Sequence, residues 1–96
     1  MSSIVPNMSF VEGKIVAIRK SPDIDHFSVM EVQPSRIGNA GSATNFLEGK
    51  ENDVLHIHIA DDVQHEHDLK EGSLISARVR LAPNNLFVIP DSVKVM

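Results

Sequence analysis

The stretch LKEGSLISARVRLAPNNLFVIPDSVKV (residues 69–95) decides the fold, because its apolar residues alternate with polar ones. A polar turn around Gly72 precedes the first apolar run, and a Pro-Asn-Asn break separates this run from a second one. Alternate side chains of a β-strand point to opposite faces of its sheet. The first run therefore predicts a half-buried strand with Arg78 and Arg80 on the solvent face. The opposite, apolar face would comprise Ile75, Ala77, Val79 and Leu81.

Two earlier segments also have the composition of strands. In residues 10–19, β-branched residues cluster around Gly13 and neither face is wholly apolar, which is typical of a strand covered on both sides or bulged at the glycine. Residues 27–33 predict a second strand that stops before Pro34. We expect Met30 and Val32 to face the core, and Phe27, Val29, Glu31 and Gln33 to face outward.

Residues 53–60 give the clearest strand, and a change of period follows it. Leu55, Ile57 and Ile59 share one face of this strand, whereas His56 and His58 share the other. Residues 61–69 predict a short helix, capped by an aspartate at its start and held by Val63 and Leu69. Residues 34–53 are rich in Gly, Ser and Asn and predict a long loop. The final strand is expected over 86–90, continuing to Val95.

The order of these elements, strands with a helix between the third and fourth, resembles the OB-fold (oligonucleotide/oligosaccharide-binding fold). FVEGKIVAIRKS resembles the first strand of such domains, and DLKEGSLISARVRL followed by NLFVIPDSVKV looks like their last two strands. The resemblance implies an all-β, five-stranded Greek-key barrel with one short helix between strands three and four. Residues 10–96 would form this domain and residues 1–9 an N-terminal arm. The loop between strands two and three is longer than a minimal OB hairpin.

Composition limits the possible functions. The 96 residues carry a net charge of −4, so any surface that binds nucleic acid must be locally basic. The absence of cysteine excludes disulfides, thiolate metal sites and cysteine nucleophiles. No signal-peptide pattern opens the chain, and no apolar run approaches the roughly 20 residues that span a bilayer. We therefore expect a cytoplasmic domain without a membrane partner.

In OB-folds that bind oligonucleotides, strands two and three and the adjoining loops carry the ligand. Bases would stack on aromatic rings while cations contact phosphates. On this chain, the resemblance assigns single-stranded DNA or RNA binding to Arg19, Lys20, Phe27, His56, His58, Arg78 and Arg80. The same residues would also suit a purely solvated face, since Asp23 and Asp25 in the first loop repel phosphate.

Other functions receive less support from the sequence. The pairs His56-x-His58 and His65-x-His67 have no zinc-motif spacing, so no metal site or cofactor is expected. Motifs of hydrolases, P-loop proteins and metalloproteases are absent, which argues against an enzyme. The alternative to nucleic-acid binding is a protein-interaction or assembly module, with a protein partner or a homo-oligomer. Val29 and the Phe46–Leu47 pair are candidates for an exposed apolar patch in that case.

Overall fold

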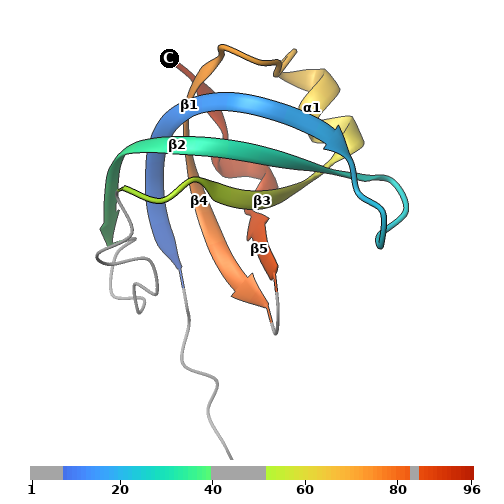
Figure 1. Ribbon diagram of the computed structural model, residues 1–96, viewed down its shortest axis with the longest axis horizontal. Coiled ribbons are helices and arrows are strands. Elements are labelled where there is room, and N and C mark those ends of the chain that lie inside the picture. Colours follow the sequence, from blue (N-terminus) through green and yellow to red (C-terminus); the bar gives the residue numbers. More distant parts are fainter. Residues whose placement is uncertain (1–7, 40–51, 83–84) are drawn as a thin grey trace, which may run out of the picture.

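The computed structural model describes residues 8–39, 52–82 and 85–96, which contain a closed five-stranded β-barrel (Figure 1). The barrel strands are β1 (Ser9–Lys20), β2 (Phe27–Asn39), β3 (Leu55–Ala60), β4 (Leu74–Ala82) and β5 (Asn85–Val88). They are ordered β1-β2-β3-β5-β4, and β1 pairs with β4 to close the barrel. The β3–β5 pairing is parallel and the others are antiparallel. The predicted barrel, with a short helix between strands three and four, is confirmed and is compatible with an OB-like fold.

The first strand is long and bends so that it takes part in two pairings. All of β1 except Val16 pairs with β2, while its first half, Ser9–Lys14, also pairs with β4. Register shifts occur between Glu12 and Gly13 and between Ile15 and Ala17. A β-bulge of this kind bends a strand and increases its twist. The predicted irregularity at Gly13 is present, but its extra residue, Ser35, lies on β2. The facing of β1 changes instead at Val16, the extra residue of the second shift, which is exposed.

Two predicted strand ends were wrong, and a proline is involved in each. The second strand does not stop before Pro34 but continues to Asn39. Pro34 lies opposite Gly13 at the register shift, where a strand tolerates a residue without an N–H. At the other end, β5 stops at Val88 because Pro90 begins a 3-10 turn, η1 (Pro90–Ser92). The chain then forms a separate short strand, β6 (Lys94–Val95), that pairs with β4.

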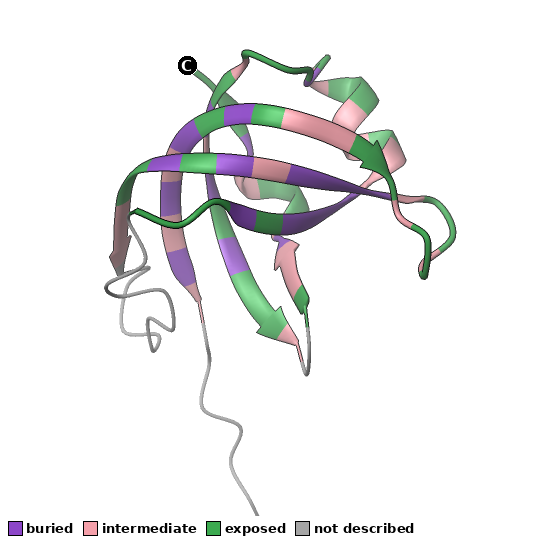
Figure 2. Cartoon of the chain, in the orientation of Figure 1, coloured by how far each residue is buried: buried purple, intermediate pink, exposed green. Residues whose placement is uncertain are grey.

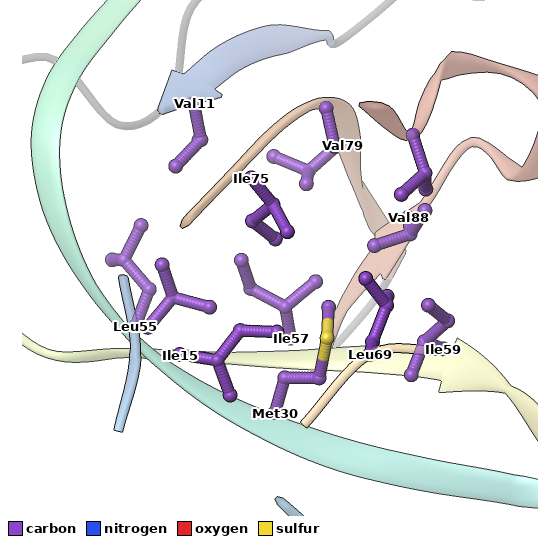
Figure 3. Close-up of a cluster of buried hydrophobic side chains, with 13 residues drawn as sticks. Val11, Ile15, Met30, Leu55, Ile57, Ile59, Leu69, Ile75, Val79 and Val88 are labelled. Carbon is purple, nitrogen blue, oxygen red and sulfur yellow. The ribbon is translucent and has the colours of Figure 1, made fainter. Parts of the chain in front are cut away.

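The core is built from the inward faces of all five barrel strands, with Leu69 after the helix and Val93 before β6 (Figure 3). On β2 and β3 the residues predicted to face inward are buried, but Val29 and His58 on the outward faces are buried as well (Figure 2). On β4 the predicted alternation is confirmed. Leu81 is the exception, since it lies near the end of β4 and is 37% exposed. Among the described residues, the largest fully buried side chains are Val11, Ile15, Met30, Val32, Ile57, Ile59, Ile75 and Val79.

The helix α1 (Asp61–Glu66) covers one end of the barrel (Figure 1). Leu69, just after it, is buried, and Val63 packs against the core, as predicted. The predicted aspartate cap is wrong, because Ala60 occupies the N-cap position and no side chain caps the helix. Within the described ranges, no helix is long and apolar enough to cross a membrane.

The loop predicted over residues 34–53 is only partly a loop in the described residues. Residues 34–39 belong to β2, and residues 52–54 lead into β3 through a turn. The remainder of that loop, including Phe46 and Leu47, lies outside the described residues, as do residues 1–7 of the predicted arm.

Candidate functional site

A row of five side chains crosses the outer surface of the barrel, one from each strand. Directly paired residues on neighbouring strands project from the same face of a sheet. The pairings Arg19–Val29, Val29–His58, His58–Phe87 and Phe87–Arg80 connect into one such row. The row therefore begins and ends with an arginine and carries two rings near its middle.

Phe27, His58 and Phe87 form an aromatic cluster on this face. The rings of Phe27 and Phe87 meet edge to face, with centroids 5.9 Å apart and planes at 89°. The His58 ring is tilted against Phe87 at a centroid distance of 5.2 Å. The guanidinium carbon of Arg80 lies 5.6 Å from the Phe87 centroid, which is within cation–π range. Phe87 thus contacts a second phenyl ring, an imidazole and a cation.

The centre of the row is closed to solvent. Val29 is 6% exposed and His58 is 8% exposed, although both belong to the outward face of their strands. The proposal of Val29 as part of an exposed apolar patch is therefore wrong. The Nδ1 atom of His58 is buried and has no hydrogen-bond partner among the described residues. His58 is therefore a buried member of the cluster that packs against Phe87. The rings of Phe27 and Phe87 are partly exposed, so they are the ones that a ligand can reach.

Arg19 and Lys20 lie at the end of β1 as expected, but carboxylates neutralise both. Arg19 donates to Glu31 on β2, and Lys20 donates to Asp61 at the start of α1. Glu31 also lies 3.8 Å from Nε2 of the exposed His56. A phosphate approaching Arg19 or Lys20 would have to displace a carboxylate, so these two cations are weaker candidates than Arg80.

Asp61 fastens the loop between β1 and β2 to the helix. Its backbone N–H donates to the His26 carbonyl at 2.9 Å, and its carboxylate accepts a 2.7 Å bond from the Ser28 hydroxyl. Hydrogen bonds from Lys20, and then from Ser28, lower the pKa of the Asp61 carboxyl below its usual value of 3.8. These bonds favour the charged form, so Asp61 holds Lys20 in place across neutral pH.

Replacing Asp61 with asparagine is expected to destabilise the protein at neutral pH. The loss of stability relative to wild type should be smaller at low pH. A carboxyl whose folded pKa is depressed stabilises the protein above its unfolded pKa and loses that contribution as the pH falls through the folded value. The stability difference between wild type and Asp61→Asn should therefore shrink as the pH falls from 7 towards and below the usual value of 3.8. Urea unfolding of both proteins across this range measures it, and a constant difference would contradict the assigned role.

Arg78 occupies a neighbouring but distinct part of the surface. It lies opposite Phe10 of β1, whereas Arg80 lies opposite Phe87 of β5. The ion pairs among described residues do not include Arg78 or Arg80. Both arginines point outward, as the alternation in β4 predicts, but the structure does not bring Arg78 to the aromatic cluster.

Sequence reasoning missed Phe87 and Phe10 as surface aromatics. Val88 is buried, so the alternation in β5 places Phe87 outward, and this signal was available in the sequence. Phe10 precedes the buried Val11 in the same way.

A pocket of about 490 Å³ lies next to Phe27 at the start of α1. Its lining residues are His26, Phe27, Ala60, Asp61, Asp62 and His65. Because two of these residues are aspartates, the pocket repels phosphate. Among the described residues, no three His, Asp or Glu side chains are placed to share a metal ion.

Comparison of the chain with protein-family models, curated proteins and solved structures found no match. Its function therefore has to be inferred from the geometry of the site.

Proposed function

We propose that this protein is a non-enzymatic, cytoplasmic binding module of the OB type that holds single-stranded nucleic acid on the aromatic cluster. The strand order, the parallel β3–β5 pairing and the helix between β3 and β4 support the OB assignment. In such barrels the surface of strands two and three binds oligonucleotides. Here that surface carries Phe27 and His58 and continues onto Phe87.

The contact of Phe87 with Phe27 and Arg80 carries the proposal. A single strand is held when bases stack on aromatic rings and cations contact the adjoining phosphates. Phe27 and Phe87 are partly exposed, and Arg80 lies beside them without an ion pair to a described residue. One base on Phe87 and its phosphate against Arg80 form the simplest arrangement that uses both of these side chains.

Fluorescence anisotropy with labelled single-stranded DNA and RNA tests this function. We expect saturable binding at low salt that weakens as salt rises, because each phosphate contact adds about −0.7 to the slope of log K against log salt. A duplex of the same sequence should compete poorly, since its stacked bases cannot reach the rings. Absence of binding at about 50 mM salt would overturn the proposal.

A protein-interaction module is the second candidate, and an exposed apolar group favours it. Leu74, Val95 and Met96 are 51%, 53% and 65% exposed. They lie together, because the Met96 N–H donates to the Leu74 carbonyl at 2.8 Å and β6 pairs with β4. Concentration-dependent association measured by analytical ultracentrifugation, without any affinity for oligonucleotides, would favour this function.

A further inference from the structure

β4 lies between β1 and β5, Val79 pairs with both of these strands, and one outward arginine lies on each side of Val79 along β4. Val79 pairs with Ser9 of β1 and with Val88 of β5. Arg78 lies on the side of β1, and Arg80 lies on the side of β5. Residues two apart in a strand are separated by about 6.8 Å and project from the same face. The two guanidinium groups therefore lie between the aromatic cluster and the place where β1 pairs with β4, which we call the seam.

The seam has an aromatic ring and cations of its own. Phe10 lies opposite Arg78, and the guanidinium of Arg36 lies 5.9 Å from the Phe10 centroid. Arg36 is also paired with Glu12 at 3.5 Å, so Arg78 and Lys94 are the cations of the seam without an ion pair to a described residue. Next to Phe10 is a pocket of about 340 Å³, a volume in the range of small-molecule sites. Its lining residues are Phe10, Ser76, Arg78, Asp91, Ser92 and Lys94.

The charges in this pocket favour an anion. Arg78 and Lys94 face a single carboxylate, Asp91, and neither cation belongs to an ion pair between described residues. Ser92 is already occupied, because its hydroxyl oxygen accepts from the Arg78 N–H at 2.8 Å and its hydroxyl donates to Ile89 at 2.7 Å. Arg78, Lys94 and the Ser76 hydroxyl are therefore left to contact a ligand.

We propose that single-stranded nucleic acid held on the aromatic cluster continues over Arg80 and Arg78 and places a further nucleotide in this seam pocket. Its phosphate contacts Arg78 and Lys94, and its base packs against Phe10. This inference rests on the proposed function and extends it from one stacking surface to two subsites joined by β4. It explains why two successive outward positions of one strand are both arginine.

Binding of short and long oligonucleotides separates the two subsites. OB-folds bind about 4 to 16 nucleotides, so a 4-mer can be held on the aromatic cluster alone, whereas a 12-mer reaches both subsites. We expect Arg78→Gln or Lys94→Gln to weaken the 12-mer about tenfold at 50 mM salt and to reduce its salt slope by about 0.7. Affinity for the 4-mer should stay nearly unchanged. Lys70→Gln is the matched control, because it removes the same charge from the acidic turn after α1.

The outcomes distinguish the inference from the function on which it rests. If wild type binds the 4-mer, but Arg78→Gln binds the 12-mer as Lys70→Gln does, the seam subsite is overturned and the proposed function stands. If Arg78→Gln weakens the 4-mer and the 12-mer equally, the surface is one site and the second subsite is also overturned. If wild type binds neither oligonucleotide, both the function and the inference fail. Circular dichroism confirms that each variant is folded.

Discussion

Replacing Gly13 with alanine is expected to lower the free energy of unfolding by about 1–3 kcal/mol, the usual cost of overpacking a filled interior. A Cβ at this position would lie 2.5 Å from the Gln33 carbonyl oxygen, 2.8 Å from a Val32 methyl group and 2.9 Å from the Pro34 Cα. Two of these three contacts are with backbone, which cannot move aside as a flexible side chain can. The alanine would therefore separate β1 from β2 at the bulge.

Gly38 provides the matched control for this substitution. It lies on the same strand pair, opposite Phe10, and a Cβ there would meet nothing within 4 Å. Gly38→Ala should therefore be neutral or stabilise by up to about 1 kcal/mol, because it restricts the unfolded chain. Urea unfolding of both variants measures the difference. Equal stabilities would contradict the close approach of β2 to Gly13.

Replacing Phe87 with alanine should weaken binding of single-stranded oligonucleotides more than any other single change on the aromatic cluster. Loss of one stacked base costs about 1–3 kcal/mol, which is roughly 5- to 150-fold in affinity. Phe87 carries this expectation because it contacts Phe27, His58 and Arg80 together.

The comparison with Phe87→Leu separates stacking from folding. Leucine retains apolar volume beside His58 but lacks an aromatic face, so it should preserve stability and still lose affinity. Val95→Ala removes an exposed apolar side chain at the C-terminus and should bind as wild type does. Anisotropy titrations at one fixed salt concentration measure all three variants. Wild-type affinity for Phe87→Leu would remove Phe87 from the binding surface.

Most of the fold could be predicted because alternation is a local property of the sequence. In β3, Leu55, Ile57 and Ile59 alternate with polar residues, and the barrel buries all three. The errors arose where pairing overrode a local signal. Pro34 normally ends a strand, yet the bulge opposite Gly13 accommodates it. His58 is polar and faces outward, yet neighbouring side chains bury it, and no sequence pattern indicates which outward residues are covered.

The candidate site could be predicted less well, because its electrostatics depend on distant contacts. Arg19 and Lys20 appear free in the sequence, but their partners Glu31 and Asp61 lie 12 and 41 positions away. Arg78 and Arg80 share a face as predicted, but only the strand order shows that they lie beside different aromatic rings. The cation–π contact of Arg36 with Phe10 likewise joins residues that no motif connects.

The acidic net charge is compatible with a basic surface because the charges are segregated. Residues 61–71 contain five carboxylates and one lysine, whereas residues 74–96 contain Arg78, Arg80 and Lys94 with one aspartate. In Figure 1, α1 lies at one end of the barrel, and the end of β4 with the start of β5 lies at the other. A polyanion would therefore meet Arg80 near β5 and be repelled near α1, which would favour one position on the surface.

We propose that single-stranded nucleic acid binds on the aromatic cluster, and NMR chemical-shift mapping tests this location most directly. The uniformly ¹⁵N-labelled protein is titrated with a single-stranded 12-mer at low salt, and the backbone amide chemical shifts of each β-strand are followed. We expect the largest changes at His58, Arg80 and Phe87, with smaller changes at Arg78 and Phe10. Changes confined to Leu74, Val95 and Met96, or no changes at all, would contradict the account.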